Sequence, residues 1–234
     1  MKVAVIPARG GSKRIPKKNI RPFLGRPIIG YSIQAALDAG LFDRVIVSTD
    51  SDEIAAVARD LGAETPFRRP EHLSDDHTGT APVVAHALEW LADAEEPADF
   101  ACCIYATAPF VAAADLAAAF RRLEASAQAF AFSVTTFAFP IQRALKRAGD
   151  GVAPFHPEFA GARSQDLEEA FHDAGQFYWG RAAAWRDGTP LFAPTSIPVV
   201  LPRWRVQDID TEEDWRRAEH MYRAIRSEAG AATP

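Results

Sequence analysis

The chain has little cysteine, no long apolar run and no targeting segment. Its 234 residues include two cysteines, Cys102 and Cys103, which are adjacent in an apolar stretch. This excludes a disulfide-linked framework, and we expect two buried thiols. No segment supplies the roughly 20 clean apolar residues of a membrane span, and the N-terminal apolar stretch reaches Arg9 without a cleavage-like site. We therefore expect a cytoplasmic protein without membrane contact.

Acidic residues are missing from the first 37 positions, although they outnumber basic residues in the whole chain. The formal net charge is −5, yet eight of the 26 basic residues precede Asp38, the first acidic residue. The rest of the chain carries 18 basic residues against 31 acidic ones. This distribution speaks against nucleic-acid or anionic-membrane binding, and it predicts a compact basic site for a small polyanion.

Short β-like runs alternate with longer helical patterns along most of the chain. Strands are predicted at 3–6, 45–47, 100–105, 129–135 and 176–179. Helices are predicted at 27–39, after Ser51, at 82–91, at 115–123 and from Thr211 onward. This alternation predicts a single α/β domain over residues 1–234, a layered sandwich with a mainly parallel sheet.

The alternating pattern weakens between residues 137 and 169, where proline and glycine recur. A long segment without clear periodicity in a compact domain commonly has a separate role. We expect residues 137–169 to form an excursion from the core that serves as a lid or as a dimer contact.

The basic segment 8–19 directly follows the first predicted strand. Ligands of α/β folds gather at the carboxyl ends of strands. Gly10 and Gly11 would allow a tight turn and a close approach to a ligand. The side chains expected to complete a phosphate cradle are Arg9, Ser12, Lys13 and Lys18. The spacing matches neither a Walker A loop nor a dinucleotide fingerprint, and a solvated basic turn is the alternative.

Three further groups of residues are candidates for binding a metal ion, a nucleotide or a sugar. Asp208 and Asp210 would face one side of a strand and suit a Mg²⁺ that shares phosphate oxygens, unless they cap the following helix. In the loop 68–80, Arg69, Thr78 and Thr80 could contact a nucleotide, unless Thr80 simply caps a helix. The run 176–180 combines Gln176 with aromatic residues and could line a sugar pocket or belong to the core. Asp50 could support the site or cap the helix after it.

These motifs, in this order, resemble the sugar-acid cytidylyltransferases, the family of the CMP-sialic acid synthetases. The resemblance covers nearly the whole chain and is carried by the segments 6–13, 47–50, 69–70 and 208–210, together with Pro16, Lys18 and Asn19. The segments 74–80, 105–110 and 175–180 are similar to the pseudaminic acid branch of that family. Sialic acid members usually carry a Gln-Pro-Thr-Ser-Pro-like run where this chain has Tyr105 to Pro109.

The resemblance implies a fold, a reaction and a set of site residues. The fold would be a Rossmann-like three-layer sandwich of the nucleotide-diphospho-sugar transferase type, in a homodimer. The reaction would join CTP to a nonulosonic acid, a nine-carbon 2-keto sugar acid, giving a CMP-sugar acid and pyrophosphate with the help of Mg²⁺. Pseudaminic acid is the expected acceptor, with legionaminic or N-acetylneuraminic acid, another nucleotidyl transfer, or a non-catalytic nucleotide-binding module as alternatives.

The same resemblance assigns roles to individual residues. The triphosphate would be held for catalysis by Arg9, Lys13 and Lys18. The nucleotide would be bound by Ala8, Gly10, Gly11, Ser12, Asn19, Arg69, Thr78 and Thr80. The sugar would be bound by Tyr105, Gln176 and Tyr178, and Mg²⁺ by Asp208 and Asp210. No side chain in the sequence identifies itself as the general base.

Overall fold

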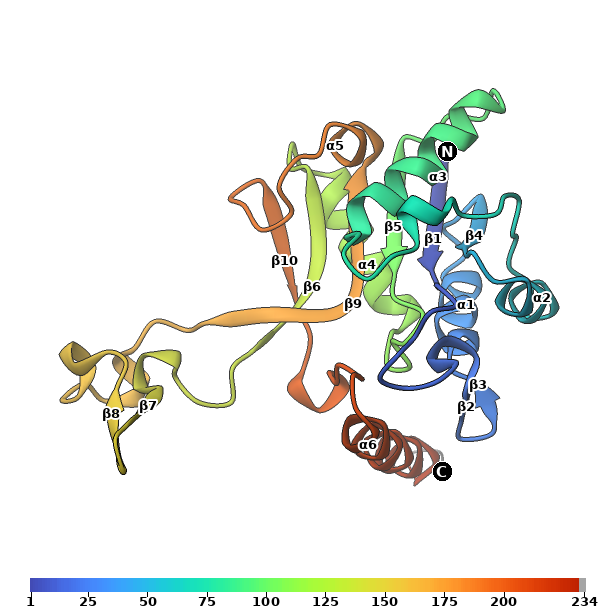
Figure 1. The fold of residues 1–234 in the computed structure, drawn as a ribbon. Coiled ribbons are helices and arrows are strands. Elements are labelled where there is room, and N and C mark those ends of the chain that lie inside the picture. The colour runs from blue at the N-terminus through green and yellow to red at the C-terminus, as the bar shows by residue number, and fades with distance from the viewer. Residues whose placement is uncertain (232–234) are drawn as a thin grey trace.

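A six-stranded sheet forms the centre of the protein in the computed structural model, which describes residues 1–231 (Figure 1). The strand order is β10-β6-β9-β5-β1-β4. The strands are β1 (Lys2–Pro7), β4 (Arg44–Ser48), β5 (Phe100–Ile104), β6 (Phe130–Thr136), β9 (Phe171–Arg181) and β10 (Ser196–Val200). β1 pairs in parallel with β4 and β5, and β6 pairs in parallel with β10. β9 runs antiparallel to β5 and β6, so the sheet is mainly parallel, as the sequence predicts.

Helices cover both faces of the sheet and make three layers. They are α1 (Ile29–Asp38), α2 (Asp52–Asp60), α3 (Thr80–Asp93), α4 (Ala113–Glu124) and α5 (Ala182–Arg186). The last helix, α6 (Glu212–Ala231), belongs to neither face and packs in a separate apolar cluster. Successive residues of β1 point to opposite faces. Ala4 and Ile6 pack with α1, α2 and α4, whereas Val3 and Val5 pack with α3 and α5. Residues of a central parallel strand are buried on both sides, which explains the unbroken apolar run at residues 3–6.

A third apolar cluster attaches the end of the chain to the basic segment. Ile15 and Phe23 pack against Trp215 of α6, and Phe23 belongs to the small hairpin of β2 (Pro22–Phe23) and β3 (Arg26–Pro27). The predicted start of α6 is confirmed, because the Asp214 amide donates to Thr211 Oγ1 at 3.2 Å and the Thr211 amide donates to Asp214 Oδ2 at 2.8 Å. This packing brings the segment before α6 next to the loop after β1.

Residues 137–170 leave the body of the protein as an arm (Figure 1). The arm contains the hairpin of β7 (Leu145–Ala148) and β8 (Gly151–Pro154), and β9 leads back from it into the sheet. The arm spans the residues 137–169 for which an excursion is predicted, and the predicted role of this segment as a lid or a dimer contact stays a prediction. The predicted short strand at 176–179 is in fact the inner half of an 11-residue strand.

Other differences from the predicted elements are local. The segment 206–210, expected to be a strand, has no regular secondary structure. β10 and the arm hairpin were not predicted. No helix among residues 1–231 combines the length and the apolar character needed to cross a membrane.

We predict that Gly180→Ala destabilises the protein, because there is no room for a methyl group at this position of β9. An added Cβ would lie 2.4 Å from Trp185 Nε1 and 2.6 Å from Phe130 Cδ1. Such overpacking typically costs about 1–3 kcal/mol. Denaturant unfolding should show a lower midpoint for this variant. Gly161→Ala in the arm is the control, since its Cβ would meet no atom within 4 Å, and equal midpoints for the two variants would contradict the prediction.

Candidate active site

A cavity of about 630 Å³ opens at the carboxyl ends of β1 and β5. Three loops line it: the basic loop after β1, the loop before α3, and the loop after β5. The lining residues include five cations, namely Arg9, Lys13, Arg14, Lys18 and Arg69, and one carboxylate, Asp76. The remaining polar lining residues are Ser12, Asn19, Thr78, Thr80, Tyr105 and Thr107. Four of the eight basic residues that precede Asp38 therefore line this one cavity, together with Arg69.

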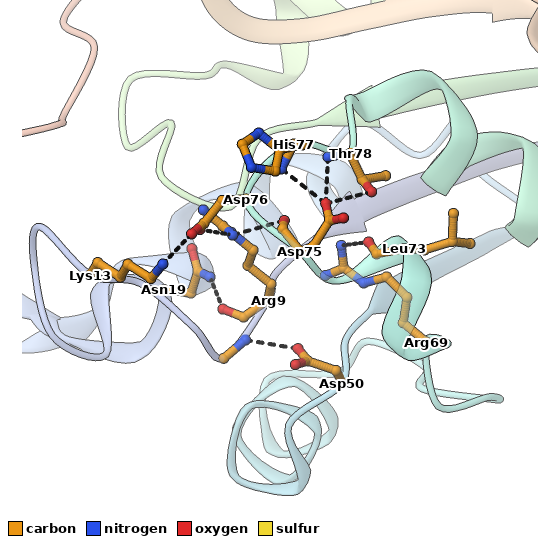
Figure 2. Close-up of polar contacts among 11 residues, drawn as sticks. Arg9, Lys13, Asn19, Asp50, Arg69, Leu73, Asp75, Asp76, His77 and Thr78 are labelled. Carbon is orange, nitrogen blue, oxygen red and sulfur yellow. Dashed lines mark hydrogen bonds and ion pairs between the residues drawn. The ribbon is translucent and has the colours of Figure 1, made fainter.

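The backbone of the basic loop is held by hydrogen bonds from its neighbours. The Ala8 amide donates to Ser48 O at 2.9 Å, and the Gly10 amide donates to Asp50 Oδ1 at 2.8 Å. Asn19 Nδ2 donates to Arg9 O at 2.9 Å (Figure 2). Asp50 therefore supports the loop, the first of the two roles considered for it from the sequence.

The two glycines of the loop differ in their surroundings. An added Cβ on Gly10 would lie 3.1 Å from Ser51 Cβ, at the start of α2, so a side chain at this position would be tightly packed against α2. An added Cβ on Gly11 would meet no atom within 4 Å. Ala8, Gly10 and Gly11 are not among the described residues that line the cavity, and their predicted nucleotide contacts stay predictions.

Asp76 reaches into the basic loop and pairs with two of its cations. Its carboxylate forms ion pairs with Arg9 and with Lys13 (Figure 2). The hydrogen bond from Lys13, followed by that from Arg9, lowers the pKa of Asp76 to about 2. The ion pairs are therefore fully formed above about pH 4, the ordinary range of a carboxyl group, and are lost as the pH falls through about 2.

The loop that carries Asp76 is shaped by the residue before it. Asp75 Oδ1 accepts hydrogen bonds from the amides of His77 and Thr78, at 2.9 and 2.6 Å, and from Thr78 Oγ1 at 2.7 Å. The hydrogen bond from the Thr78 hydroxyl is the main reason why the pKa of Asp75 is lowered. Arg9 Nη1 also donates to Asp75 O at 2.8 Å. Neither carboxylate had been assigned a role from the sequence, although both lie in the motif 74–80.

Asp210 neutralises the other end of the basic loop. Arg14 Nη1 lies 2.9 Å from Asp210 Oδ2. Lys18 Nζ lies 3.4 Å from Asp210 Oδ1 and donates to Ile209 O at 2.7 Å. Segments separated by almost 200 residues therefore meet here, whereas the predicted contacts of Lys18 with phosphate and of Asp210 with Mg²⁺ stay predictions. Arg14 is an addition to the predicted site residues.

Asp208 faces a second cavity of about 370 Å³ that lies beside the outer part of β6 and β9. Desolvation, and then the charge of Asp210, raises the pKa of Asp208 against the opposing effect of Lys18. Two mutually repelling carboxylates are a donor set that suits Mg²⁺, which is usually held by one or two carboxylates together with phosphates and water. Within residues 1–231 no group of three or more metal-ligating side chains is assembled.

Arg69 places a buried positive charge at the wall of the cavity. Its side chain is 5% exposed, and Nη2 donates to Ser48 O at 2.8 Å, while Nε has no partner. Burial lowers the pKa of Arg69, partly offset by the charge of Asp50. A guanidinium that lines a cavity favours an anionic or carbonyl-bearing ligand.

The predicted sugar-binding residues differ in whether they line the cavity or are buried beneath it. Tyr105 lines the cavity, and its hydroxyl lies 3.2 Å from Thr80 Oγ1. Thr80 is the first residue of α3 and the helix cap is Gly79, so the proposed capping role of Thr80 is wrong. Gln176 and Tyr178 are both buried, and Gln176 Nε2 donates to Arg205 O at 2.6 Å. Their contact with a sugar stays a prediction.

This arrangement can bind a small polyanion between the basic loop and the loop before α3. The cations could stabilise negative charge that develops on phosphate oxygens, and Asp208 with Asp210 could share a divalent cation with those oxygens. The geometry suits the transfer of a phosphoryl-containing group to an acceptor bound beside it.

Comparison with known proteins supports this interpretation. The family model described as "Cytidylyltransferase" matches residues 3–176. Pseudaminic acid cytidylyltransferase of Campylobacter jejuni is 44% identical over 97% of this chain and 98% of its own length. N-acylneuraminate cytidylyltransferase B of Danio rerio is 31% identical over 93% of this chain and 50% of its own length. The solved structure of a CMP:2-keto-3-deoxy-manno-octonic acid synthetase complexed with CTP has a TM-score of 0.69, with 16% identity, over 96% of this chain and 99% of the other.

We predict that Asp76→Asn strengthens the binding of CTP, because it releases Arg9 and Lys13 from a competing carboxylate. Exposed ion pairs are weak, so the dissociation constant should fall by about three- to tenfold in an isothermal titration. Asp52→Asn is the matched control, since Asp52 pairs with Arg68 at 2.7 Å outside the cavity. Weaker CTP binding by Asp76→Asn would show instead that Asp76 helps to hold the ligand.

Proposed function

Because this chain belongs to the cytidylyltransferase family, we propose that it transfers CMP from CTP to a nonulosonic acid, and that this acceptor is pseudaminic acid. One observation carries the proposal: five cations line one cavity, and three of them, Arg9, Lys13 and Lys18, belong to the predicted phosphate site. Two pseudaminic acid cytidylyltransferases, 43% and 44% identical over 97% of the chain, support the choice of acceptor. Nothing in these comparisons supports a non-catalytic module.

The proposed reaction is an in-line displacement at the α-phosphorus of CTP. The anomeric hydroxyl oxygen of the sugar acid forms the new bond to phosphorus and gives up its proton. The bond from the α-phosphorus to the oxygen that bridges to the β-phosphorus breaks, and pyrophosphate leaves with the electron pair. Negative charge is then spread over the non-bridging and leaving oxygens. Arg9, Lys13 and Lys18 stabilise that charge electrostatically.

Nucleotide binding involves an exchange of counter-ions. Asp76 neutralises Arg9 and Lys13, and Asp210 neutralises Arg14 and Lys18. The phosphates of CTP replace Asp76 on the first pair. Positively charged side chains that are already gathered in one place lower the cost of binding a triphosphate, since they need little rearrangement.

We propose Mg²⁺ as the divalent cation, held by Asp208 and Asp210. Bound there, it would neutralise negative charge on the phosphate oxygens as a Lewis acid. Burial, and then the charge of Asp210, raises the pKa of Asp208, and a divalent cation bound between the two carboxylates would oppose both effects. Release of Asp210 from Arg14 and Lys18 would accompany metal binding.

The remaining predicted contacts follow from their places around the cavity. Asn19, Arg69, Thr78 and Thr80 line it and are proposed to surround the cytidine. Tyr105 lies on the side of the cavity nearest β9 and is proposed to contact the sugar.

We also place the reaction in the cytoplasm, in keeping with two buried free thiols, Cys102 and Cys103.

We further propose that the protein is a homodimer in which the arm contacts the second copy. Large apolar side chains are exposed along and at the base of the arm, at Phe137, Phe139, Ile141, Leu145, Val152, Phe155 and Phe171. Phe139 alone is 83% exposed. Monomeric proteins seldom expose so much apolar surface in one region, so a partner that covers it is expected.

The proposed function predicts pyrophosphate release from CTP and Mg²⁺ in the presence of pseudaminic acid. We would compare pseudaminic, legionaminic, N-acetylneuraminic and 3-deoxy-manno-octulosonic acids by a continuous pyrophosphate assay. Pseudaminic acid should have the highest kcat/KM. A preference for another acid would keep the reaction and change the acceptor, whereas no turnover with any of the four would contradict the proposal.

Two neighbouring lysines provide matched controls for this assay. Lys13→Gln should lower kcat/KM by about 100-fold or more, because it removes a charge that faces the phosphates. Lys17→Gln should stay close to the wild type, since Lys17 pairs with Glu53 at 2.6 Å and does not line the cavity. Equal activity of the two variants would argue against the phosphate site.

The homodimer is tested by sedimentation velocity. We predict a dimer for the wild type and a folded monomer for the double variant Phe139→Asp, Val152→Asp, because two charges in the arm would oppose burial of its apolar surface. Leu37→Asp, at an exposed apolar position of α1, should remain a dimer. A monomeric wild type at micromolar concentration would rule out the proposed assembly.

A further inference from the structure

The segment 206–210 carries both proposed metal ligands, Asp208 and Asp210, and has no regular secondary structure. The hydrogen bonds of a strand or helix therefore do not fix the separation of the two carboxylates. One side chain of the segment, Ile209, is fully buried, in the apolar cluster that also contains Trp215. The ligands of a cation must be held within about 0.5 Å of their working geometry. The contacts at the two ends of the segment therefore decide how well it can hold a metal.

Arg205 ties the beginning of this segment to α4. Its Nη2 donates to Asp115 Oδ2 at 2.6 Å, and the two side chains are only 20% and 22% exposed. Asp115 lies in the first turn of α4, where the helix dipole favours a negative charge. The next residue, Leu116, is fully buried, and its carbonyl oxygen accepts from Trp179 Nε1 at 3.0 Å. Arg205 therefore pairs with a carboxylate that is fixed to the core of the protein.

The backbone of Arg205 is held as well. The buried Gln176 of β9 donates from Nε2 to Arg205 O at 2.6 Å. The following residue, Val206, packs against the apolar cluster that contains Leu116. Arg205 is thus fixed by its side chain and by its carbonyl oxygen, to α4 and to the central sheet. Asp208 follows three residues later, so this end of the segment sets its place.

Arg21 ties the other end of the segment to the loop after β1. It forms an ion pair with Glu212, the first residue of α6, with Nη2 3.1 Å from Oε2. Its guanidinium also lies over the ring of Trp215, at 4.5 Å from the centroid, which strengthens the contact. Asp208 and Asp210 therefore lie between two arginine–carboxylate pairs along the chain.

These two pairs differ from the ion pairs that Asp210 makes itself. Arg14 and Lys18 line the cavity, and in the proposed reaction Asp210 leaves them when it binds the cation. Arg205 and Arg21 are not among the described residues that line the cavity, so a ligand bound there does not compete for their carboxylates. Their pairs therefore persist while the contacts of Asp210 exchange.

From this arrangement we infer that Arg205 and Asp115 are positioning residues for the divalent cation. The inference rests on the proposed function, in which Asp208 and Asp210 hold Mg²⁺. The pair keeps Asp208 within reach of Asp210 when Asp210 leaves its own cations. It is better shielded from water than the pair at the other end of the segment, since Glu212 is half-exposed, and shielded pairs are the stronger ones.

The experiment compares the dissociation constant of CTP in excess Mg²⁺ with that in EDTA, by isothermal titration, for the wild type, Asp115→Asn and Arg205→Met. The ratio of the two constants measures how much the cation strengthens nucleotide binding. Both substitutions remove a charge with little change in the length of the side chain. We expect the constant in EDTA to stay within about twofold of the wild type, and the gain from Mg²⁺ to fall by about 5- to 20-fold.

Arg44→Met is the matched control for a general loss of stability. Arg44 is 18% exposed and pairs with Glu64 and Glu96, and it lies at the start of β4, at the opposite end of the strand from the cavity. This variant should lower the denaturation midpoint and leave the ratio unchanged. The double variant of Asp115→Asn and Arg205→Met should show the same ratio as either single variant, because one substitution already breaks the pair.

The outcomes separate this inference from the proposed function. An unchanged ratio in Asp115→Asn and Arg205→Met, or an equal loss in Arg44→Met, would overturn the inference while the proposed function stands. If Mg²⁺ does not strengthen CTP binding to the wild type, the proposed metal site is wrong and the inference fails with it. If the wild type shows the expected ratios but no turnover, the proposed transfer is contradicted and the positioning role is supported.

Discussion

The concentration of positive charge at the carboxyl ends of β1 and β5 is the constraint on which the rest of the site depends. Five cations around one cavity repel one another unless anions are placed among them. The chain supplies these anions from distant segments: Asp76 from the loop before α3 and Asp210 from the segment before α6. Asp50, after β4, holds the backbone of the basic loop. The cavity is thus preassembled, with carboxylates at positions that phosphates or a cation can take over.

The fold could be predicted where burial determines the sequence. The apolar run at residues 3–6 identifies β1, because a central strand is buried on both faces. The capping residues Ser51 and Thr211 identify the starts of α2 and α6. The arm hairpin escaped prediction because the residues of β7 are exposed and show no alternation between a buried and a solvated face. The outer half of β9 escaped prediction for the same reason, since Phe171, His172 and Asp173 are exposed.

Part of the site could be predicted because some of its residues form a recognisable pattern within one segment of the sequence. Arg9, Lys13 and Lys18 stand out because they follow a strand and lack acidic neighbours in sequence. Asp76 and Arg14 do not stand out, since their partners lie in other loops and only the folded chain brings them together. The segment 206–210 was expected to be a strand because alternating residues share a face. Its irregular backbone still places Asp210 beside Lys18, because the packing of Trp215 on Phe23 fixes its position.

β9 connects the part of the sheet beside the cavity with the arm. Its inner half pairs with β5 and β6 beside the cavity, its outer half leads into the arm, and the bulge at 174–177 separates the two registers. Changes in the length or composition of the arm lie outside the paired residues of β6 and β9. They therefore leave the pairing of Tyr178 with Phe132 intact. The sequence of the arm can therefore change without disturbing the strand pairing beside the cavity.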